Sequence, residues 1–184
     1  MVEVRVTQEI EVKYRVFDED ALLAALRARG VVLSAPVVQD DQAFAPVGWR
    51  YGMSKRGVPF GRLRTQGGRH WFTVKRPVSN ELVCVEHETV VADRGQMHGA
   101  LLVMGFVPTV RIVKSRRVGS WDDATVCVDV VDGLGVFVEV EALVAVGGSG
   151  EATQERLHGR VCSLGVPVER VTETYDSLLR AGQG

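Results

Sequence analysis

The chain has 184 residues, of which 46% are hydrophobic and 24% are charged, as in an ordinary globular protein. The formal net charge of −1 argues against a strong general attraction to nucleic acid or to an anionic membrane. No apolar run approaches the roughly 20 residues that a membrane-spanning helix needs, and the charged N-terminus does not resemble a signal peptide. We therefore expect one domain over residues 1–184, located in the cytoplasm, with neither a nucleic-acid nor a membrane partner.

Residue patterns divide the chain into strands and helices. Alternation of apolar and polar residues predicts strands over 2–16, 59–66, 69–76, 82–91, 109–118, 125–131 and 136–146, and an extended segment over 31–46. Apolar stripes behind capping residues predict helices over 19–29, 93–106 and 149–164, and a short last helix capped by Thr172. About eight strands, mostly joined as hairpins, predict one α+β domain whose antiparallel sheet is large enough to close into a barrel.

Charged residues keep the same parity within each of these strands. Members of a pair two residues apart point to the same side of the sheet. The sets are Glu9, Glu11 and Lys13; Arg62 and Arg64; Thr73 and Lys75; Glu86 and Glu88; Lys114 and Arg116; Asp129; and Glu139 and Glu141. The opposite faces are apolar and amphipathic helices can cover them, so closure of the sheet would turn the charged faces inward.

A barrel interior with so many charges is costly unless the charges pair, hydrate or bind a ligand. Six cations can surround several phosphates, since arginine binds phosphate oxygens bidentately and lysine acts as a point charge. The carboxylates would repel phosphate unless a divalent cation bridges the two. Charges of both signs therefore favour a metal with a polyphosphate. The alternative is a solvated sheet face on which opposite charges of neighbouring strands merely pair.

The remaining reactive or aromatic residues predict no second site. The cysteines, Cys84, Cys127 and Cys162, have no metal-ligand spacing and are expected to be buried free thiols in a reducing compartment. We expect the glycine-rich basic loop over 47–57, with Arg50, Lys55 and Arg56, to be solvated. The tryptophans, Trp49, Trp71 and Trp121, are expected to pack in the core or at its rim rather than to form a base-stacking platform.

The charged motifs resemble those of the CYTH superfamily, the triphosphate tunnel metalloenzymes, from about Glu9 to Leu179. The matching segments are Glu9-Ile10-Glu11-Val12-Lys13 (ExExK), Arg62-Leu63-Arg64 (RxR), Thr73-Val74-Lys75, Glu86-His87-Glu88 (ExE), Lys114-Ser115-Arg116 (KxR) and Thr174 to Leu179. The run from Val128 to Glu141, with its Gly133-Leu134-Gly135 turn, is similar to the class IV adenylyl cyclase (CyaB-like) branch. Two segments depart from the family pattern. Cys84 stands where a basic residue is frequent, and Asp41-Gln42-Ala43-Phe44-Ala45 replaces D-x-Y-F-D.

The resemblance implies an eight-stranded antiparallel β-tunnel with helices packed outside, often in a homodimer. It assigns Mg²⁺ or Mn²⁺ to four carboxylates, Glu9, Glu11, Glu139 and Glu141. It assigns the phosphates to Lys13, Arg62, Arg64, Lys75, Lys114 and Arg116 and places Asp129 near the metal end. Lys13, Lys114 and Asp129 are our candidate catalytic residues.

Three functions fit these assignments. The first is a class IV adenylyl cyclase-like activity, which converts ATP to cyclic AMP and pyrophosphate. The second is an inorganic, thiamine or nucleoside triphosphatase that releases phosphate. The third is a non-catalytic module that binds a phosphate ligand. The four carboxylates assigned to the metal argue against this third function, since binding alone could use cations only. The expected partner is accordingly a nucleoside or other organic triphosphate, or tripolyphosphate.

Overall fold

A computed structural model of the chain describes residues 7–145 and 149–182. Its strands are β1 (Thr7–Val16), β2 (Val37–Pro46), β3 (Phe60–Gln66), β4 (Arg69–Pro77), β5 (Val83–Val91), β6 (Phe106–Trp121), β7 (Ala124–Val131), β8 (Gly135–Ala145) and β9 (Val168–Val171). Its helices are α1 (Glu19–Ala28), α2 (Arg94–Val103), α3 (Gly150–Cys162) and α4 (Tyr175–Ala181). The ends of the predicted strands at residues 2–6 and 146 lie outside the described residues.

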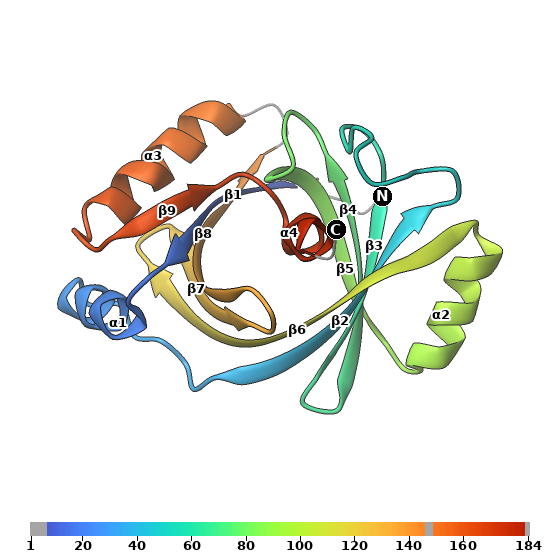
Figure 1. Cartoon of the computed structure of the whole chain (residues 1–184), viewed down its shortest axis with the longest axis horizontal. Helices are drawn as coiled ribbons and strands as arrows, with labels where there is room; N and C mark the ends of the chain where they lie inside the picture. The colour runs from blue at the N-terminus through green and yellow to red at the C-terminus, as the bar shows by residue number, and fades with distance from the viewer. Residues whose placement is uncertain (1–6, 146–148, 183–184) are drawn as a thin grey trace, which may run out of the picture.

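Strands β1 to β8 close into a ring, as the sequence predicts (Figure 1). The order is β5-β4-β3-β2-β6-β7-β8-β1, and β1 also pairs with β5, which closes the ring. Each strand is antiparallel to its neighbours. Strand β1 pairs with β8 along its whole length and divides its other edge between two strands. Residues 8–10 pair with β5, whereas residues 13–16 pair with the short β9, which the sequence patterns did not predict.

The outward face of the ring is apolar and is covered by helices. Helices α1 and α3 form one core with β1, β7 and β8; its buried members include Val12, Tyr14, Leu22, Leu26, Val126, Val138, Val140, Leu157 and Val161. Helix α2 forms a second core through Leu101, which packs with Phe44 and Leu63. Full burial of each such side chain contributes roughly 1.5–3 kcal/mol. These cores therefore fix which sheet face points out, and the charged face is left to point inward.

The helix boundaries follow local capping. Asp18, Asp93 and Ser149 each accept a hydrogen bond from a backbone N–H in the first turn of α1, α2 and α3. Helix α2 ends at Val103 rather than 106, because Gly105 adopts a φ of +85° and Phe106 begins the long strand β6. The prediction of Thr172 as the cap of the last helix is wrong, since the N-cap is Thr174, which makes no side-chain capping bond.

The three cysteines are free, as expected, but only two of them are buried. Cys84 and Cys127 lie on ring strands, whereas Cys162 is exposed. Cys162 is the last residue of α3, where Val161, one position earlier, takes the face that packs on the ring. The expectation of three buried thiols is therefore wrong for this helix end.

Helix α4 corrects the expectation that all helices pack outside, because it lies within the outline of the ring (Figure 1). Tyr175 packs with Ile112, Val131 and Phe137 in a third core. These three residues have the parity of Lys114, Asp129 and Glu139 on their strands, so they are on the inward face. One end of the ring is thus apolar inside, and α4 buries its own apolar stripe there.

Candidate active site

A cavity of about 310 Å³ lies inside the ring. Its lining includes ten of the predicted site residues: Glu9, Glu11, Lys13, Arg62, Arg64, Lys75, Lys114, Arg116, Glu139 and Glu141. Asp129 is the predicted residue that does not line it. Closure of the ring therefore brings together side chains that are far apart in the sequence.

Three of the four predicted metal carboxylates meet in this cavity. One oxygen from each of Glu9, Glu11 and Glu141 lies within 4.8 Å of the others. The reason is the strand register, which places Glu11 directly opposite Glu141. Burial, and then the charge of Glu9, raises the pKa of Glu141 to about 8. Burial, and then Glu139, also raises the pKa of Glu11. Three crowded carboxylate oxygens suit a hard divalent cation such as Mg²⁺ or Mn²⁺, which would relieve their repulsion.

Glu139, the fourth predicted ligand, lies in the same cavity but is occupied by cations. Its carboxylate is 3.2 Å from the Lys13 ammonium and also pairs with Arg116. Burial opposes ionisation, but Lys13 and Arg116 hold the pKa of Glu139 well below its usual range. Lys13 lies directly opposite Glu139 in the register, two residues along each strand from the Glu11–Glu141 pair. The metal role of Glu139 stays a prediction.

Asp129 is the centre of a buried ion cluster behind the cavity wall. It is 0% exposed and accepts hydrogen bonds from Lys114 at 2.9 Å and from Arg116 at 2.6 Å and 2.5 Å. The Tyr175 hydroxyl donates a further hydrogen bond to it at 3.0 Å. Burial, and then the neighbouring Arg116, lowers the pKa of Lys114 to about 8. Asp129 therefore holds two predicted phosphate-binding cations in place, and its catalytic role stays a prediction.

On the opposite wall, the cations of β3 and β4 also pair with carboxylates, which come from β1, β2 and β5. Arg64 makes a bidentate pair with Asp41, at 2.7 Å for both hydrogen bonds. Lys75 lies 2.5 Å from Glu9 and 2.6 Å from Glu86. Arg62 reaches Glu88 at 3.1 Å and Thr73 at 3.0 Å. A phosphate that enters the cavity must compete with these carboxylates for the arginine and lysine donors.

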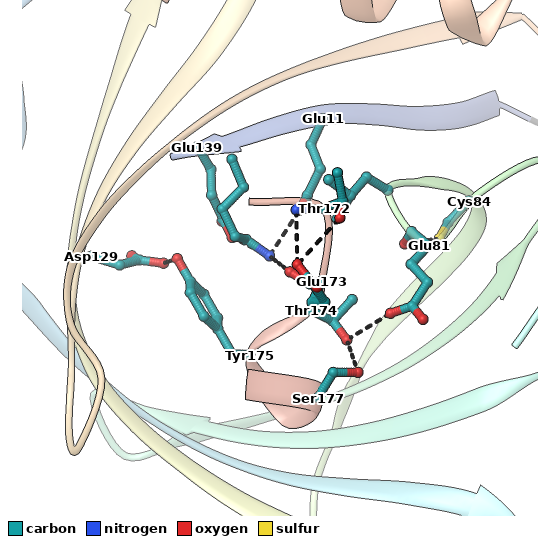
Figure 2. Close-up of polar contacts among 12 residues, drawn as sticks. Glu11, Glu81, Cys84, Asp129, Glu139, Thr172, Glu173, Thr174, Tyr175 and Ser177 are labelled. Carbon is teal, nitrogen blue, oxygen red and sulfur yellow. Dashed lines mark hydrogen bonds and ion pairs between the residues drawn. The ribbon is translucent and has the colours of Figure 1, made fainter. Parts of the chain in front are cut away.

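Lys55 is a site residue that the sequence patterns missed, and the expectation that it is solvated is wrong. It is buried, and its ammonium donates to Glu81 at 3.0 Å, Asp176 at 3.1 Å, and Thr174 and Ser177 at 2.7 Å. Figure 2 shows Thr174 between Glu81 and Ser177. A loop cation carries no strand parity, so no pattern revealed it. Lys55 ties the loop over 47–57 to the start of α4.

The C-terminal segment enters the site beside these cations. The Lys13 ammonium lies 4.3 Å from the centre of the Tyr175 ring and donates to the backbone carbonyl of Glu173 at 3.3 Å. The Lys114 ammonium is 4.9 Å from the same ring. In Figure 2 the Tyr175 side chain points to Asp129, and Glu173 and Thr174 lie between Glu11 and Glu81. Helix α4 thus contributes a cation–π surface to the cavity and occupies one end of the ring.

Comparisons with known proteins agree with this geometry. The family model described as the CYTH domain matches residues 7–175. A Methanocaldococcus jannaschii protein, named as a candidate adenylate cyclase, is 24% identical over 135 residues, which cover 72% of this chain and 75% of the relative. A Pyrococcus horikoshii structure shares the fold with a TM-score of 0.79 at 22% identity, covering 95% of this chain and 99% of that one. A Hippeastrum structure, described as an adenylyl cyclase candidate with a dominant triphosphatase activity, has a TM-score of 0.66 at 19% identity and covers 96% of each chain.

None of the helices in the described ranges is both long enough and apolar enough to cross a membrane.

Proposed function

Because the chain belongs to the CYTH domain family, we propose that it binds a triphosphate together with a divalent cation inside the ring and cleaves one of its phosphoanhydride bonds. The observation that carries the proposal is the meeting of the carboxylates of Glu9, Glu11 and Glu141 with six cations in one cavity. Cations alone would suffice to bind an anion. Carboxylates whose oxygens lie within 4.8 Å of one another are unfavourable in such a cavity unless a cation joins them.

Each wall has a distinct part in the proposed reaction. Glu9, Glu11 and Glu141 would hold Mg²⁺ or Mn²⁺, with Glu139 as a further predicted ligand. The bound ion would supply positive charge to a phosphate oxygen. Arg62, Arg64 and Lys75 on one side, and Lys13, Lys114 and Arg116 on the other, would stabilise the negative charge that grows on the leaving phosphate. Carboxylates hold these cations at the cavity before substrate binds.

ATP cyclisation is the reaction that we propose to test first. In this reaction the 3′-hydroxyl of ATP attacks the α-phosphorus, and pyrophosphate leaves into the cationic part of the cavity. The run from Val128 to Glu141 and the name of the Methanocaldococcus relative support it. The run forms β7, a turn and β8, which place Asp129, Glu139 and Glu141 on the inward face. The similarity of this run to the cyclase branch therefore supports the charged site as much as it supports cyclisation over hydrolysis.

Triphosphate hydrolysis is the second candidate. A water would attack the terminal phosphorus, and the description of the Hippeastrum protein supports this alternative. Ala43 and Ala45, which replace the tyrosine and the second aspartate of the family pattern, also favour it, since they leave the cavity wall without the usual polar groups.

Product analysis separates the two reactions. Purified protein is incubated with ATP or tripolyphosphate and Mg²⁺ or Mn²⁺, and the products are resolved by ion-exchange chromatography. Cyclic AMP with pyrophosphate identifies a cyclase, whereas orthophosphate identifies a triphosphatase. The absence of turnover with every compound, combined with tight binding that needs no metal, would contradict the proposed function and favour a binding module.

A further inference from the structure

The cavity has an apolar end that its charges do not explain. Strand β3 places Phe60, Arg62 and Arg64 on its inward face at two-residue spacing. Successive side chains on this face are therefore about 6.6 Å apart along the strand, and the aromatic ring comes before the two arginines. The neighbouring strand β2 repeats this change, since Asp41 opposite Arg64 is followed on the cavity wall by Ala43 opposite Arg62 and then by Ala45. Strand β2 is therefore apolar from Ala43 onward, opposite Arg62, and β3 becomes apolar two residues further on at Phe60.

Trp49 completes this apolar end from the loop over 47–57. Its ring packs edge-to-face on Phe60, with a centroid distance of 5.0 Å and an interplanar angle of 87°. Its indole N–H donates to the Ser54 carbonyl at 3.3 Å, which fixes the ring within its own loop. Trp49 is only half-buried although it lines the cavity, so it leaves aromatic surface open. Two small side chains, Ala43 and Ala45, line the cavity on the adjoining strand β2.

We infer that Ala43, Ala45, Trp49 and Phe60 form a subsite for a flat heteroaromatic group carried by the triphosphate, so that the substrate is an organic triphosphate rather than inorganic tripolyphosphate. The inference rests on the proposed function, because a triphosphate bound by Arg62, Arg64 and Lys75 is what delivers the attached group to this end. Tripolyphosphate has nothing to place against two aromatic rings. A heteroaromatic group gains stacking contact there, and such contacts tolerate different ring types.

Thr174 and Asp176 give this subsite a polar edge. Both line the cavity, and both contact the Lys55 ammonium, which lies 5.7 Å from the centre of the Phe60 ring. A buried pocket with a few convergent polar groups beside apolar walls is the usual form of a site for a small organic molecule. The polar edge is suited to hydrogen bonding by a ring that bears nitrogen substituents.

The test compares substrates across matched variants. Values of kcat/KM are measured for tripolyphosphate, four nucleoside triphosphates (ATP, GTP, CTP and UTP) and thiamine triphosphate in the wild type, Trp49→Ala and Met53→Ala. Met53 is exposed on the same loop and does not line the cavity, so its variant is the control. We expect at least one organic triphosphate to surpass tripolyphosphate in the wild type. Trp49→Ala should lower kcat/KM for that compound by about 10- to 100-fold and leave tripolyphosphate within about threefold.

A second variant fills the subsite instead of emptying it. Ala43→Leu should also reduce use of the organic triphosphate selectively, because the larger side chain projects into the space that the ring would occupy. Retained tripolyphosphate turnover shows that both variants are folded. Equal losses for organic and inorganic compounds, or a wild type that uses tripolyphosphate best, would overturn the inference.

Calorimetric binding of ATP and tripolyphosphate to the same variants separates this inference from the proposed function. Absent turnover contradicts the proposed function. If Trp49→Ala nevertheless weakens ATP binding about 10-fold or more relative to tripolyphosphate, the subsite is supported. If the two ligands lose affinity equally, or if neither binds the wild type, the subsite is refuted.

Discussion

Two ion clusters on the inward face of the ring use the same residue types in different ways. The Asp129 cluster (Asp129, Lys114, Arg116 and Tyr175) is closed, with side-chain exposures of 0% for Asp129 and 4% for Lys114. The Lys75 cluster (Lys75, Glu9, Glu86 and Arg62) is open, and Lys75 retains 30% and Arg62 24% of their side-chain exposure. The first cluster is completed by α4 and its central Asp129 does not line the cavity, whereas every member of the second cluster lines it.

This difference separates charges that support the wall from charges that are available to a ligand. Asp129 has three hydrogen-bond donors and no contact with the cavity, so it acts on substrate only through Lys114 and Arg116. In the Lys75 cluster, the Arg62 Nε atom is buried and has no hydrogen-bond partner within the described ranges. A ligand with oxygen acceptors would satisfy it. Strand parity in the sequence predicts that both clusters face inward. It does not distinguish charges that stabilise the wall from charges that are available to a ligand.

The largest effect should come from breaking the closed cluster. Asp129→Asn leaves Lys114 and Arg116 buried without their full countercharge, so we expect the free energy of unfolding to fall by about 3–5 kcal/mol. Glu88→Gln is the comparison at the open wall, where the Glu88 side chain is 41% exposed and should contribute no more than about 1 kcal/mol. Urea denaturation measures both changes. An equal loss in the free energy of unfolding for the two variants would contradict the distinction between charges that stabilise the wall and charges that are available to a ligand.

The three carboxylates of Glu9, Glu11 and Glu141 should control the metal-dependent reaction. Glu11→Gln removes one charged ligand, and metal-dependent turnover should fall by about 10²- to 10³-fold, because a bound cation provides several kcal/mol of transition-state stabilisation. Steady-state rates across a Mg²⁺ or Mn²⁺ titration measure the loss. Glu169→Gln, at an exposed position of β9, is the matched control. A wild-type rate in Glu11→Gln at every metal concentration would refute the metal role.

A substitution of Lys55 tests whether contacts from the loop over 47–57 hold α4 in place, in addition to the packing of Tyr175. Lys55→Met keeps the length of the side chain but removes the ammonium from Glu81, Asp176, Thr174 and Ser177, which should cost about 1–3 kcal/mol. Hydrogen exchange should accelerate chiefly in α4, which then keeps the hydrogen bond from the Tyr51 hydroxyl to the Ser177 carbonyl but loses the Lys55 contacts with the loop. Arg50→Met, an exposed change in the same loop, should leave exchange unaltered. Unchanged protection of α4 in Lys55→Met would show that the Lys55 contacts are not needed to hold α4.

The pH dependence of stability should report the crowding of the carboxylates. Folding raises the pKa of Glu141 from 4.5 to about 8, so its contribution to stability is fully present below about pH 4.5 and is lost as the pH rises through 8. Without metal, the wild type should therefore lose stability relative to Glu141→Gln between pH 5 and 9. The loss should be at least about 1 kcal/mol, since one pKa unit corresponds to about 1.4 kcal/mol. Thermal unfolding of both proteins across this range measures it, and a constant difference would contradict the burial argument.

Strand parity predicted the ring and most of the site because it maps directly onto the two faces of a sheet. Once Val12, Val138 and Val140 are committed to the outer core, Glu11 and Glu139 have to point inward. Parity does not give the register between strands, however. Glu141 and Glu139 are two residues apart on β8 and have the same parity. Glu141 lies opposite Glu11, whereas Glu139 lies opposite Lys13 and is neutralised by it.

The position of α4 had a signal in the sequence that charge patterns did not use. Ile112, Val131 and Phe137 interrupt the inward parity of their strands with apolar side chains, which need a cover from within. The stripe of Tyr175, Leu178 and Leu179 supplies that cover. Lys55 and Trp49 had no comparable signal, because their loop has no periodicity and tertiary contacts alone place them at the cavity.

The most direct test of the central claim is a crystal structure of the protein grown with Mn²⁺ and tripolyphosphate. We expect an anomalous peak from an ion bonded to carboxylate oxygens of Glu9, Glu11 and Glu141, and phosphate oxygens that contact both this ion and the side chains of Arg64 and Lys75. A phosphate chain bound outside the ring, or one inside it with no ion at these carboxylates, would contradict the account.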